Sequence, residues 1–537
     1  MRILGALKTA VAAVFLARTA LCLAVFHNQD AAVRRDEMLE GSHVRLGARD
    51  ATLSTQTSSA LHTGYPNSTV SVTATVATSN ISSSASTVTA STTTSTATST
   101  LTTTATATSG GGTTTTSTSG KELTIEIQND RDEPINAYIG GKQRIVVNGT
   151  APTLEPVMLR TDLNQYYPLK NVPANDSNSP TSVPSYIPLA IRIPAKSSSN
   201  VTLPDYLISG RVWIAEGDLE FRAYPGGAFS EPSGANPSLS EYNVKWGFVE
   251  LNHDAGGLII NLSFVDWVSL SLGMSLTFAT GQGTNTSSVP GLEAGAMQNI
   301  CNDLKTQASI SGSNGTHDWD KLCIYSEDGK DLLRVFSPNI DASIHRPNST
   351  LVNYYDDYIN QVWDKYQKQN LTLQLQGGSD GMPLTTPGPG QATTCSVQAN
   401  SNMTCDQSDH SYPKPTTADI WGCNSGPFFV GDINATVPRD MMHSRIIPRL
   451  CAAFTRSTLL LDGGNMQPFA NVTDYYSANV TNHYSRIVHN YLANGKGYSF
   501  SYDDVNPWGI DHDAAGVLAA DKPAKVHIDV KGDQADK

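Results

Sequence analysis

From Lys121 onward, the chain is built of short runs in which apolar and polar residues alternate. In "KELTIEIQND", Leu123, Ile125 and Ile127 are separated by polar residues, which is the period-2 pattern of a half-buried strand. The segments "QRIVVNGT", "LAIRIPAK" and "GRVWIAEGDLEFRAYPGG" continue this pattern, with Gly, Pro, Asn and Asp clustered between them. Closely spaced strands joined by turn residues favour antiparallel sheets. We therefore expect an antiparallel β-barrel or sandwich.

After about residue 290 the apolar spacing becomes helical. In "EAGAMQNICNDLKTQ", Met297, Ile300 and Leu304 recur at helical intervals, and "VNYYDDYINQVWDKYQKQ", "MMHSRIIPRLCAAFTRSTLL" and "YYSANVTNHYSRIVHNYL" are further helix candidates. Residues 371–422 are rich in Gly, Pro, Ser and Thr and are predicted to be a large loop, whereas strand patterns return in "KGYSFSYDDV" and "AKVHIDV". The predicted class is mainly β with α+β. Its parts are a β-barrel part at 121–290, a mixed α/β part at 291–500 and C-terminal strands completing the domain at 501–533.

The residues before this domain have a different composition. Residues 1–24, "MRILGALKTAVAAVFLARTALCLA", combine early basic residues, an apolar run and small residues, which predicts a secretory signal peptide, with a short signal anchor as the alternative. Residues 25–50 are interpreted as a propeptide or linker. Residues 51–120 are well over half Ser and Thr. Such a tract buries too little apolar surface to fold, so we expect a disordered, O-glycosylated stalk on a secreted protein, extracellular or associated with a cell wall.

The net charge limits the classes of binding partner, and the cysteine count predicts disulfides. The net charge of −13 argues against nucleic acid or an anionic membrane as partner once the signal is removed. Sequons recur throughout, as expected of a secreted glycoprotein.

Six cysteines outside the signal suggest three disulfides; 15 pairings are possible and sequential pairing is the simplest. No CxxC occurs, which argues against a zinc or redox motif. The disulfide candidates are Cys301, Cys323, Cys395, Cys405, Cys423 and Cys451.

Two carboxylates stand in the otherwise apolar stretch "WGFVELNHDAGGLIINLSFVDWVSL". Period-2 counting places Trp246, Phe248 and Glu250 on one strand face, and Asp266 shares a face with Phe264 on the next strand. Glycoside hydrolysis needs one acid to protonate the leaving oxygen and a second carboxylate to activate water or attack carbon. Aromatic rings beside these acids would suit sugar binding.

The spacing of the two acids along the strands is a difficulty for this hypothesis. A tight turn over residues 254–257 would pair Glu250 with about Asn261. Asp266 would then lie roughly 17 Å further along, at ~3.4 Å per residue. Carboxyl groups that act on one glycosidic bond lie ~5–9.5 Å apart. We therefore expect a wider turn, or a bend, bulge or strong twist; the alternative is two carboxylates on a solvent-facing strand surface.

Several motifs resemble those of glycoside hydrolase family 64, the β-1,3-glucanases of the thaumatin-like superfamily. They include "SGRVWIAEGDLEF", "EPSGANPSLSEYNVKWGFVEL", "NLSFVDWVSL", "IPRLCAAFTRSTLL", "TNHYSRIVH" and "GKGYSFSYDDV", and the likeness covers residues 121–533. The resemblance implies a thaumatin-like barrel or sandwich and a mixed α/β domain flanking a wide groove. It also implies cleavage of β-1,3-glucan with inversion, with Glu250 as general acid and Asp266 as general base.

The same resemblance points to substrate-binding positions in the groove. Asn252, Asp254 and Ser263 stand where the family commonly has Thr, Asn and Thr, so cleavage pattern is left open. Trp246 is a further candidate for contact with sugar, although core packing is the alternative for it. Asn261 heads a sequon between the two catalytic candidates, and we expect the strand to fold too tightly for a glycan to be added there.

Two classes of function are therefore considered. The first is a secreted endo-β-1,3-glucanase that acts as a monomer, with β-1,3-glucan as its partner and with neither a metal nor another cofactor. The second is a non-catalytic, wall-associated, glucan-binding thaumatin-like protein, because a fold can keep its groove and lose its chemistry. The intact pair of Glu250 and Asp266 favours the enzyme. A second acidic pair, Asp503 and Asp504 in "YDDV", is interpreted as structural.

Overall fold

The computed structural model describes residues 121–146, 152–173, 179–310, 316–375, 392–406, 408, 410–429, 441–507 and 514–532. The predicted signal peptide, linker and stalk, residues 1–120, lie outside the described residues. No helix among the described residues is long and apolar enough to span a membrane.

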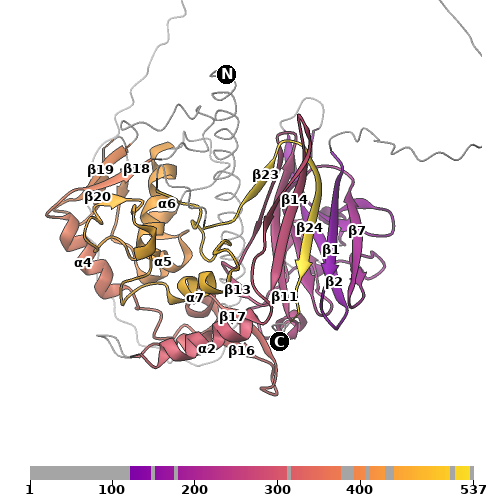
Figure 1. Ribbon diagram of the computed structural model, residues 1–537, viewed down its shortest axis with the longest axis horizontal. Helices are drawn as coiled ribbons and strands as arrows, with labels where there is room; N and C mark the ends of the chain where they lie inside the picture. The colour runs from indigo at the N-terminus through magenta and orange to yellow at the C-terminus, as the bar shows by residue number, and fades with distance from the viewer. Residues whose placement is uncertain are drawn as a thin grey trace, which may run out of the picture. The chain divides into compact units, whose positions relative to one another are not determined.

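A five-stranded sheet joins the first and last strands of the described chain. Its order is β15–β14–β24–β1–β7, and β24 pairs parallel with β1 and antiparallel with β14. The C-terminal strand therefore lies between the first strand and one from mid-chain (Figure 1). The bounds are β1 Leu123–Asn129, β7 Ser197–Leu203, β14 Leu272–Thr280, β15 Gly283–Val289 and β24 Pro523–Val530.

An eight-stranded sheet carries the stretch that holds Glu250. Its order is β23–β12–β11–β8–β2–β3–β4, with β6 paired to β2. The bounds are β2 Ile135–Ile145, β3 Thr153–Arg160, β4 Gln165–Pro168, β6 Ile191–Ile193, β8 Leu207–Ala215, β11 Trp246–Asp254, β12 Gly257–Leu262 and β23 Leu518–Ala520.

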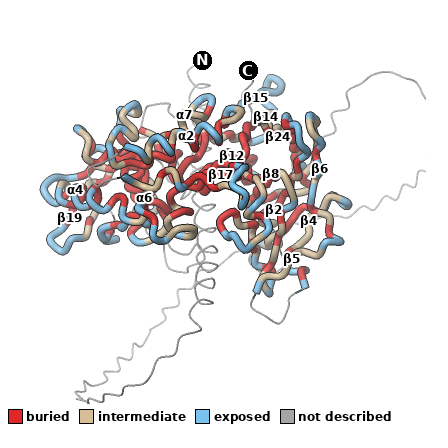
Figure 2. Tube along the Cα trace, turned by 90° about the horizontal axis from the view of Figure 1, so that it is seen from below, coloured by how far each residue is buried: buried red, intermediate tan, exposed pale blue. Residues whose placement is uncertain are grey.

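The two large sheets share one apolar core. Buried side chains of the first sheet, such as Ile125 and Ile528, belong to the same cluster as Val212 and Val249 of the second. Buried residues follow the interior strands (Figure 2). Both sheets are open in the described part of the chain, with separate edge strands. The barrel expectation is therefore wrong and the sandwich alternative holds, because the apolar faces are covered by each other rather than by closure of one sheet.

Three further sheets, two of three strands and one of five, and a set of helices complete the described residues. The sheets are β10–β9–β5, β13–β17–β16 and β21–β20–β19–β18–β22. Their strands are β5 Thr181–Ser182, β9 Arg222–Ala223, β10 Phe229–Ser230, β13 Trp267–Val268, β16 Cys323–Tyr325, β17 Leu332–Phe336, β18 Leu371–Gln374, β19 Ala392–Val397, β20 Met403–Cys405, β21 Ser411–Tyr412 and β22 Met466–Gln467. The helices are α2 Ala296–Ala308, α3 Pro338–Ile340, α4 Asp356–Tyr366, α5 Thr417–Gly422, α6 Met441–Thr455 and α7 His483–Tyr491; the short 3-10 or π turns are η1 Leu169–Asn171, η2 Ser240–Asn243, η3 Trp319–Leu322, η4 Asp341–His345, η5 Gly426–Phe428 and η6 Val472–Asp474.

The local patterns were interpreted correctly where burial is one-sided. β1 alternates buried and half-buried residues along its whole length, as its period-2 sequence predicts. In α2 the buried set includes Met297, Ile300 and Leu304, which are the residues at helical spacing. Helices also form within the other three segments predicted to be helical.

Two predictions about local structure are wrong. The described part of residues 371–422 is not one large loop, because it holds β18 to β21 and α5. The segment "KGYSFSYDDV" is not a strand: Tyr498 makes an isolated bridge with Ser263, and turns follow. Asp503 draws this segment into turns, since its carboxylate accepts hydrogen bonds from the Ser499 N–H and hydroxyl at 3.0 and 2.8 Å.

The disulfides pair in sequence order, which confirms the simplest of the expected pairings. They join Cys301 to Cys323, Cys395 to Cys405, and Cys423 to Cys451. The first ties α2 to β16, the second clips β19 to β20, and the third links the end of α5 to α6. All three lie after residue 290, so the β-sandwich depends on its apolar core.

Candidate active site

The two faces of β11 have different roles. Val249 and Leu251 point into the core shared by the two large sheets. Trp246 and Phe248 belong instead to a second, aromatic cluster on the opposite face of the sheet. Because side chains alternate along a strand, Glu250 shares that second face with the two aromatic residues, as the period-2 count predicts.

Glu250 lies in a row of three polar side chains that crosses adjacent strands. The register pairs it with Arg211 on β8 and Asn261 on β12. Its Oε1 accepts a hydrogen bond from Arg211 Nη2 at 3.1 Å, and its Oε2 accepts one from Asn261 Nδ2, also at 3.1 Å. The Glu250 side chain is only 2% exposed. The turn over residues 254–257 that sets this pairing is the tight one, so the wider turn, one of the two alternatives, is wrong.

Arg211 also holds a second carboxylate. Its Nη1 forms an ion pair with Glu231, which follows β10 directly and whose side chain is 28% exposed. The guanidinium of Arg211 lies over the ring of Phe248, 4.6 Å from the centroid. One buried cation therefore links two carboxylates from different segments, on the face that carries the aromatic cluster.

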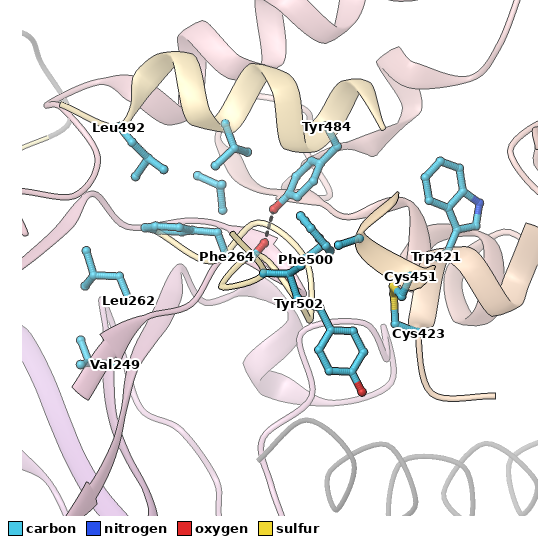
Figure 3. Close-up of a cluster of buried hydrophobic side chains, with 14 of the residues drawn as sticks. Val249, Leu262, Phe264, Trp421, Cys423, Cys451, Tyr484, Leu492, Phe500 and Tyr502 are labelled. Atoms are coloured by element: carbon cyan, nitrogen blue, oxygen red, sulfur yellow. Dashed lines mark hydrogen bonds between the residues drawn. A yellow bond between two sulfur atoms is a disulfide. The ribbon is translucent and has the colours of Figure 1, made fainter. Parts of the chain in front are cut away.

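The chain does not run straight on from β12 toward Asp266. After Leu262, the Phe264 N–H donates to the Tyr498 carbonyl at 2.8 Å. The Tyr484 hydroxyl of α7 donates to the Phe264 carbonyl at 2.6 Å, as the dashed line in Figure 3 marks. After these contacts the chain bends at Val265 and Asp266, so the extrapolation of roughly 17 Å along a straight strand does not apply.

The same segment returns to the face of β11 that carries Glu250. Trp267 Nε1 donates to the Trp246 carbonyl at 3.0 Å, and the two rings are 4.7 Å apart. The Trp267 ring also lies 6.4 Å from that of Phe248, two residues from Glu250. Asp266 immediately precedes Trp267, so a bend is present in the segment that carries it. That Asp266 faces Glu250 across a groove stays a prediction.

Asp266 itself is nearly covered, with 8% of its surface exposed. Its carbonyl accepts a hydrogen bond from the Ser337 N–H at 2.8 Å, which fixes the backbone at this point. Burial, with a smaller contribution from the charge of Asp266, raises the pKa of Tyr484 well above its ordinary value. The hydroxyl of Tyr484 therefore stays protonated beside this carboxylate.

The candidate substrate-binding residues make local contacts. Asn252 Oδ1 accepts from the Ser209 N–H at 3.3 Å, and Asp254 Oδ1 accepts from the Gly256 N–H at 2.6 Å within the turn. Ser263 is buried and itself forms the isolated bridge with Tyr498. Their role in binding glucan stays a prediction.

Trp246 packs as a core residue. It is 1% exposed, and its Nε1 donates to the Glu241 carbonyl at 3.2 Å. This supports the alternative interpretation of Trp246, since a ring so covered has no free face for a sugar. Among the described residues, no group of three or more His, Cys, Asp or Glu side chains could hold a metal ion.

Comparison with known proteins identifies the family. The family model for glycoside hydrolase family 64, described as Beta-1,3-glucanase, matches residues 121–530. The chain belongs to glycoside hydrolase family 64. Two curated relatives named glucan endo-1,3-beta-glucosidase, from Cellulosimicrobium cellulans and Arthrobacter sp. (strain YCWD3), are each 26% identical over 321 residues. The match covers 57% of this chain and 50% of each relative, so the chain spans about half their length.

Solved structures agree at the level of fold. A laminaripentaose-producing β-1,3-glucanase in complex with laminaritetraose has a TM-score of 0.59 and 24% identity, and the match covers 77% of this chain and 99% of that one. A family 64 β-1,3-glucanase domain from Clostridium beijerinckii has a TM-score of 0.53 and 18% identity, covering 77% and 98%. The architecture of the described sandwich and helices is thus shared with family 64 structures.

Two residues linked to Glu250 by ion pairs were missed from the sequence. Arg211 and Glu231 stand in the family-like segments "SGRVW" and "EPSGANPS", but no role was assigned to either. One signal could have found Arg211. It is a charged residue in a predicted strand that is otherwise rich in apolar residues, and pairing that strand with the one that holds Glu250 would have placed the two side by side. Glu231 follows a two-residue strand, and nothing in the local pattern aims it at Arg211.

In the second acidic pair, Asp503 has a structural role. This residue is fully buried, and its carboxylate accepts from Arg456 Nη2 at 3.0 Å and contacts His489 Nε2 at 2.8 Å. Burial opposes its charge, but His489 and Arg456 outweigh that effect and lower the pKa of Asp503 to about 2. A carboxylate so enclosed by its partners holds the chain together, as the sequence interpretation of "YDDV" supposed.

Proposed function

We propose that this family 64 chain is an endo-acting β-1,3-glucanase that hydrolyses β-1,3-glucan by an inverting acid/base mechanism. The observation that supports the proposal is the packing of Trp267, the residue after Asp266, against Trp246 and Phe248 on the face of β11 that carries Glu250. Family membership and the two curated glucan endo-1,3-beta-glucosidases support the substrate class.

In the proposed reaction Glu250 donates its proton to the glycosidic oxygen as the bond from that oxygen to C1 breaks. A water molecule attacks C1 from the opposite face of the sugar, and Asp266 takes the proton that this water loses. One water is consumed, and the new reducing end has the inverted anomeric configuration. Both acids are nearly covered in this structure, so the covering side chains must move when glucan binds.

The finer parts of the proposal rest on the family. They are a thaumatin-like architecture whose mixed part flanks a wide groove, groove contacts by Asn252, Asp254 and Ser263, secretion to the cell exterior or wall, and a monomeric state. Family membership over residues 121–530 supports the architecture and the groove. The signal-like sequence of residues 1–24 supports secretion.

The test is release of reducing sugar from laminarin by the wild type and by Glu250→Gln and Asp266→Asn. We expect each substitution to reduce turnover by about 10²-fold or more, because acid–base groups contribute factors of this size. NMR of the first-formed anomer should show inversion. A Glu250→Gln variant as active as the wild type would refute the assignment.

The burial of Glu250 and its pairing with Arg211 favour one second candidate, a glucan-binding protein without hydrolytic activity. In that case the wild type would bind insoluble β-1,3-glucan in a sedimentation assay and release no sugar. Sedimentation and sugar release measured on one preparation separate the two functions.

A further inference from the structure

The segment around Arg211 contains more charge than a simple ion pair. Arg211 is nearly buried, with Glu250 on one side and Glu231 on the other. Its ring contact with Phe248 and its position on the central strand β8 leave the guanidinium little freedom. Because the two carboxylates contact different nitrogens, Nη1 and Nη2, the arginine can hold both at once.

The groups that face Glu250 come from several elements. Arg211 contacts it from β8 and Asn261 from β12, and Glu231 stands beyond Arg211. Asp266, with the hydroxyl of Tyr484 nearby, lies in the segment that returns to this face. Two carboxylates, Glu250 and Glu231, therefore share the guanidinium of Arg211, so the charge that Arg211 presents to Glu250 depends on Glu231.

We propose that Arg211 and Glu231 are positioning residues for Glu250: Arg211 orients its carboxyl group, and Glu231 neutralises the arginine so that Glu250 can keep the proton the reaction needs. This inference rests on the proposed function. An arginine without a second partner favours the ionised form of a neighbouring carboxyl group, which cannot act as a general acid. Glu231 offsets that effect without touching the substrate.

The chain offers a matched control close by. Arg222 likewise links two carboxylates, the buried Glu241 and the more exposed Glu220. The arrangement has the same chemistry and also a half-exposed outer carboxylate, but it does not include Glu250. Glu220→Gln therefore removes an equivalent ion pair without changing the charge that Arg211 presents to Glu250.

The experiment is the pH profile of kcat/KM on soluble β-1,3-glucan for the wild type, Glu231→Gln and Glu220→Gln. Without the Glu231 charge, the positive charge of Arg211 acts undiminished on the general acid. An opposite charge nearby lowers the pKa of a carboxyl group by about 1–3 units, so the alkaline limb should move to lower pH by about one unit. On that limb the activity would fall about tenfold. Glu220→Gln should leave the limb in place. An unmoved limb in Glu231→Gln, or a shift to higher pH, would overturn the inference.

Arg211→Lys tests the orienting role. Lysine keeps the charge, but its single ammonium group lacks the fork that holds two carboxylates. We expect kcat to fall about tenfold or more at the pH optimum with KM nearly unchanged, in protein whose circular dichroism matches the wild type. A purely structural role would lower only the melting temperature and leave kcat per folded molecule intact. If Glu250→Gln abolishes activity while Glu231→Gln has the wild-type profile, this inference fails and the proposed function stands.

Discussion

The variant Asp503→Asn tests whether Asp503 is a structural acid, in contrast to Glu250, the proposed catalytic acid. The substitution keeps the shape of the side chain and removes its charge. Arg456, itself buried, then loses its ion-pair partner at 3.0 Å and keeps hydrogen bonds to the Asp503 and Val505 carbonyls. Breaking a buried pair by removing one partner costs about 3–5 kcal/mol, because the remaining charge is left uncompensated.

That loss can be converted into a melting temperature. The family 64 domain covers residues 121–530, and unfolding entropy is about 2.1 cal/mol/K per residue. A loss of about 3–5 kcal/mol then corresponds to a fall of about 3–6 °C. Differential scanning calorimetry would measure this directly, with Asp328→Asn as control. Asp328 pairs with Lys330 on the surface, and its loss should leave the melting temperature nearly unchanged.

Activity completes the test. Asp503 makes its side-chain contacts with Arg456, His489 and Ser499 and not with Glu250, so Asp503→Asn should keep its specific activity on laminarin well below its melting temperature. A variant that melts like the wild type would refute the structural reasoning. A variant that folds normally and is inactive would place Asp503, rather than Glu250, in the chemistry.

Three further outcomes are expected. The folded-state pKa of Asp503 is depressed to about 2, so its contribution of roughly 2 kcal/mol is present above pH ~4 and is lost as the pH falls toward 2; acid unfolding followed by circular dichroism should show this loss in the wild type and not in Asp503→Asn. Asn261 donates its buried amide to Glu250, so glycopeptide mass spectrometry of secreted protein should find Asn261 unmodified despite its sequon. Replacing Cys423 and Cys451 by Ala should destabilise the fold by about 3–4 kcal/mol, given their separation of 28 residues, and a double variant that melts like the wild type would contradict this.

The sequence predicted the local geometry of β11 and β12 well. Alternation placed Glu250 on the face with Trp246, and the glycine-containing turn at 254–257 fixed the pairing with Asn261. Both features depend on residues close in the chain, whose geometry a period-2 pattern and a tight turn determine. The sandwich and the order of the disulfides were likewise among the stated expectations.

What the sequence could not supply depends on contacts between distant segments. The return of Trp267 to the Trp246 carbonyl depends on the bridge at residue 263 and on the α7 hydroxyl of Tyr484, more than 200 positions away. The apolar alternation in "KGYSFSYDDV" was overridden by the buried charge of Asp503. Local propensity is a weak prior wherever a buried polar group must be satisfied.

The two buried carboxylates differ in how their partners are shared. Asp503 meets Arg456 and His489, so its negative charge is matched by its immediate partners and the fold gains from keeping it ionised. Glu250 shares Arg211 with Glu231, so one guanidinium serves two carboxylates. A buried ion pair is weak evidence of a stabilising role, because apolar residues of similar size often serve the fold as well. The role of the shared arginine is therefore tested by activity, through Glu231→Gln and Arg211→Lys, rather than by melting temperature.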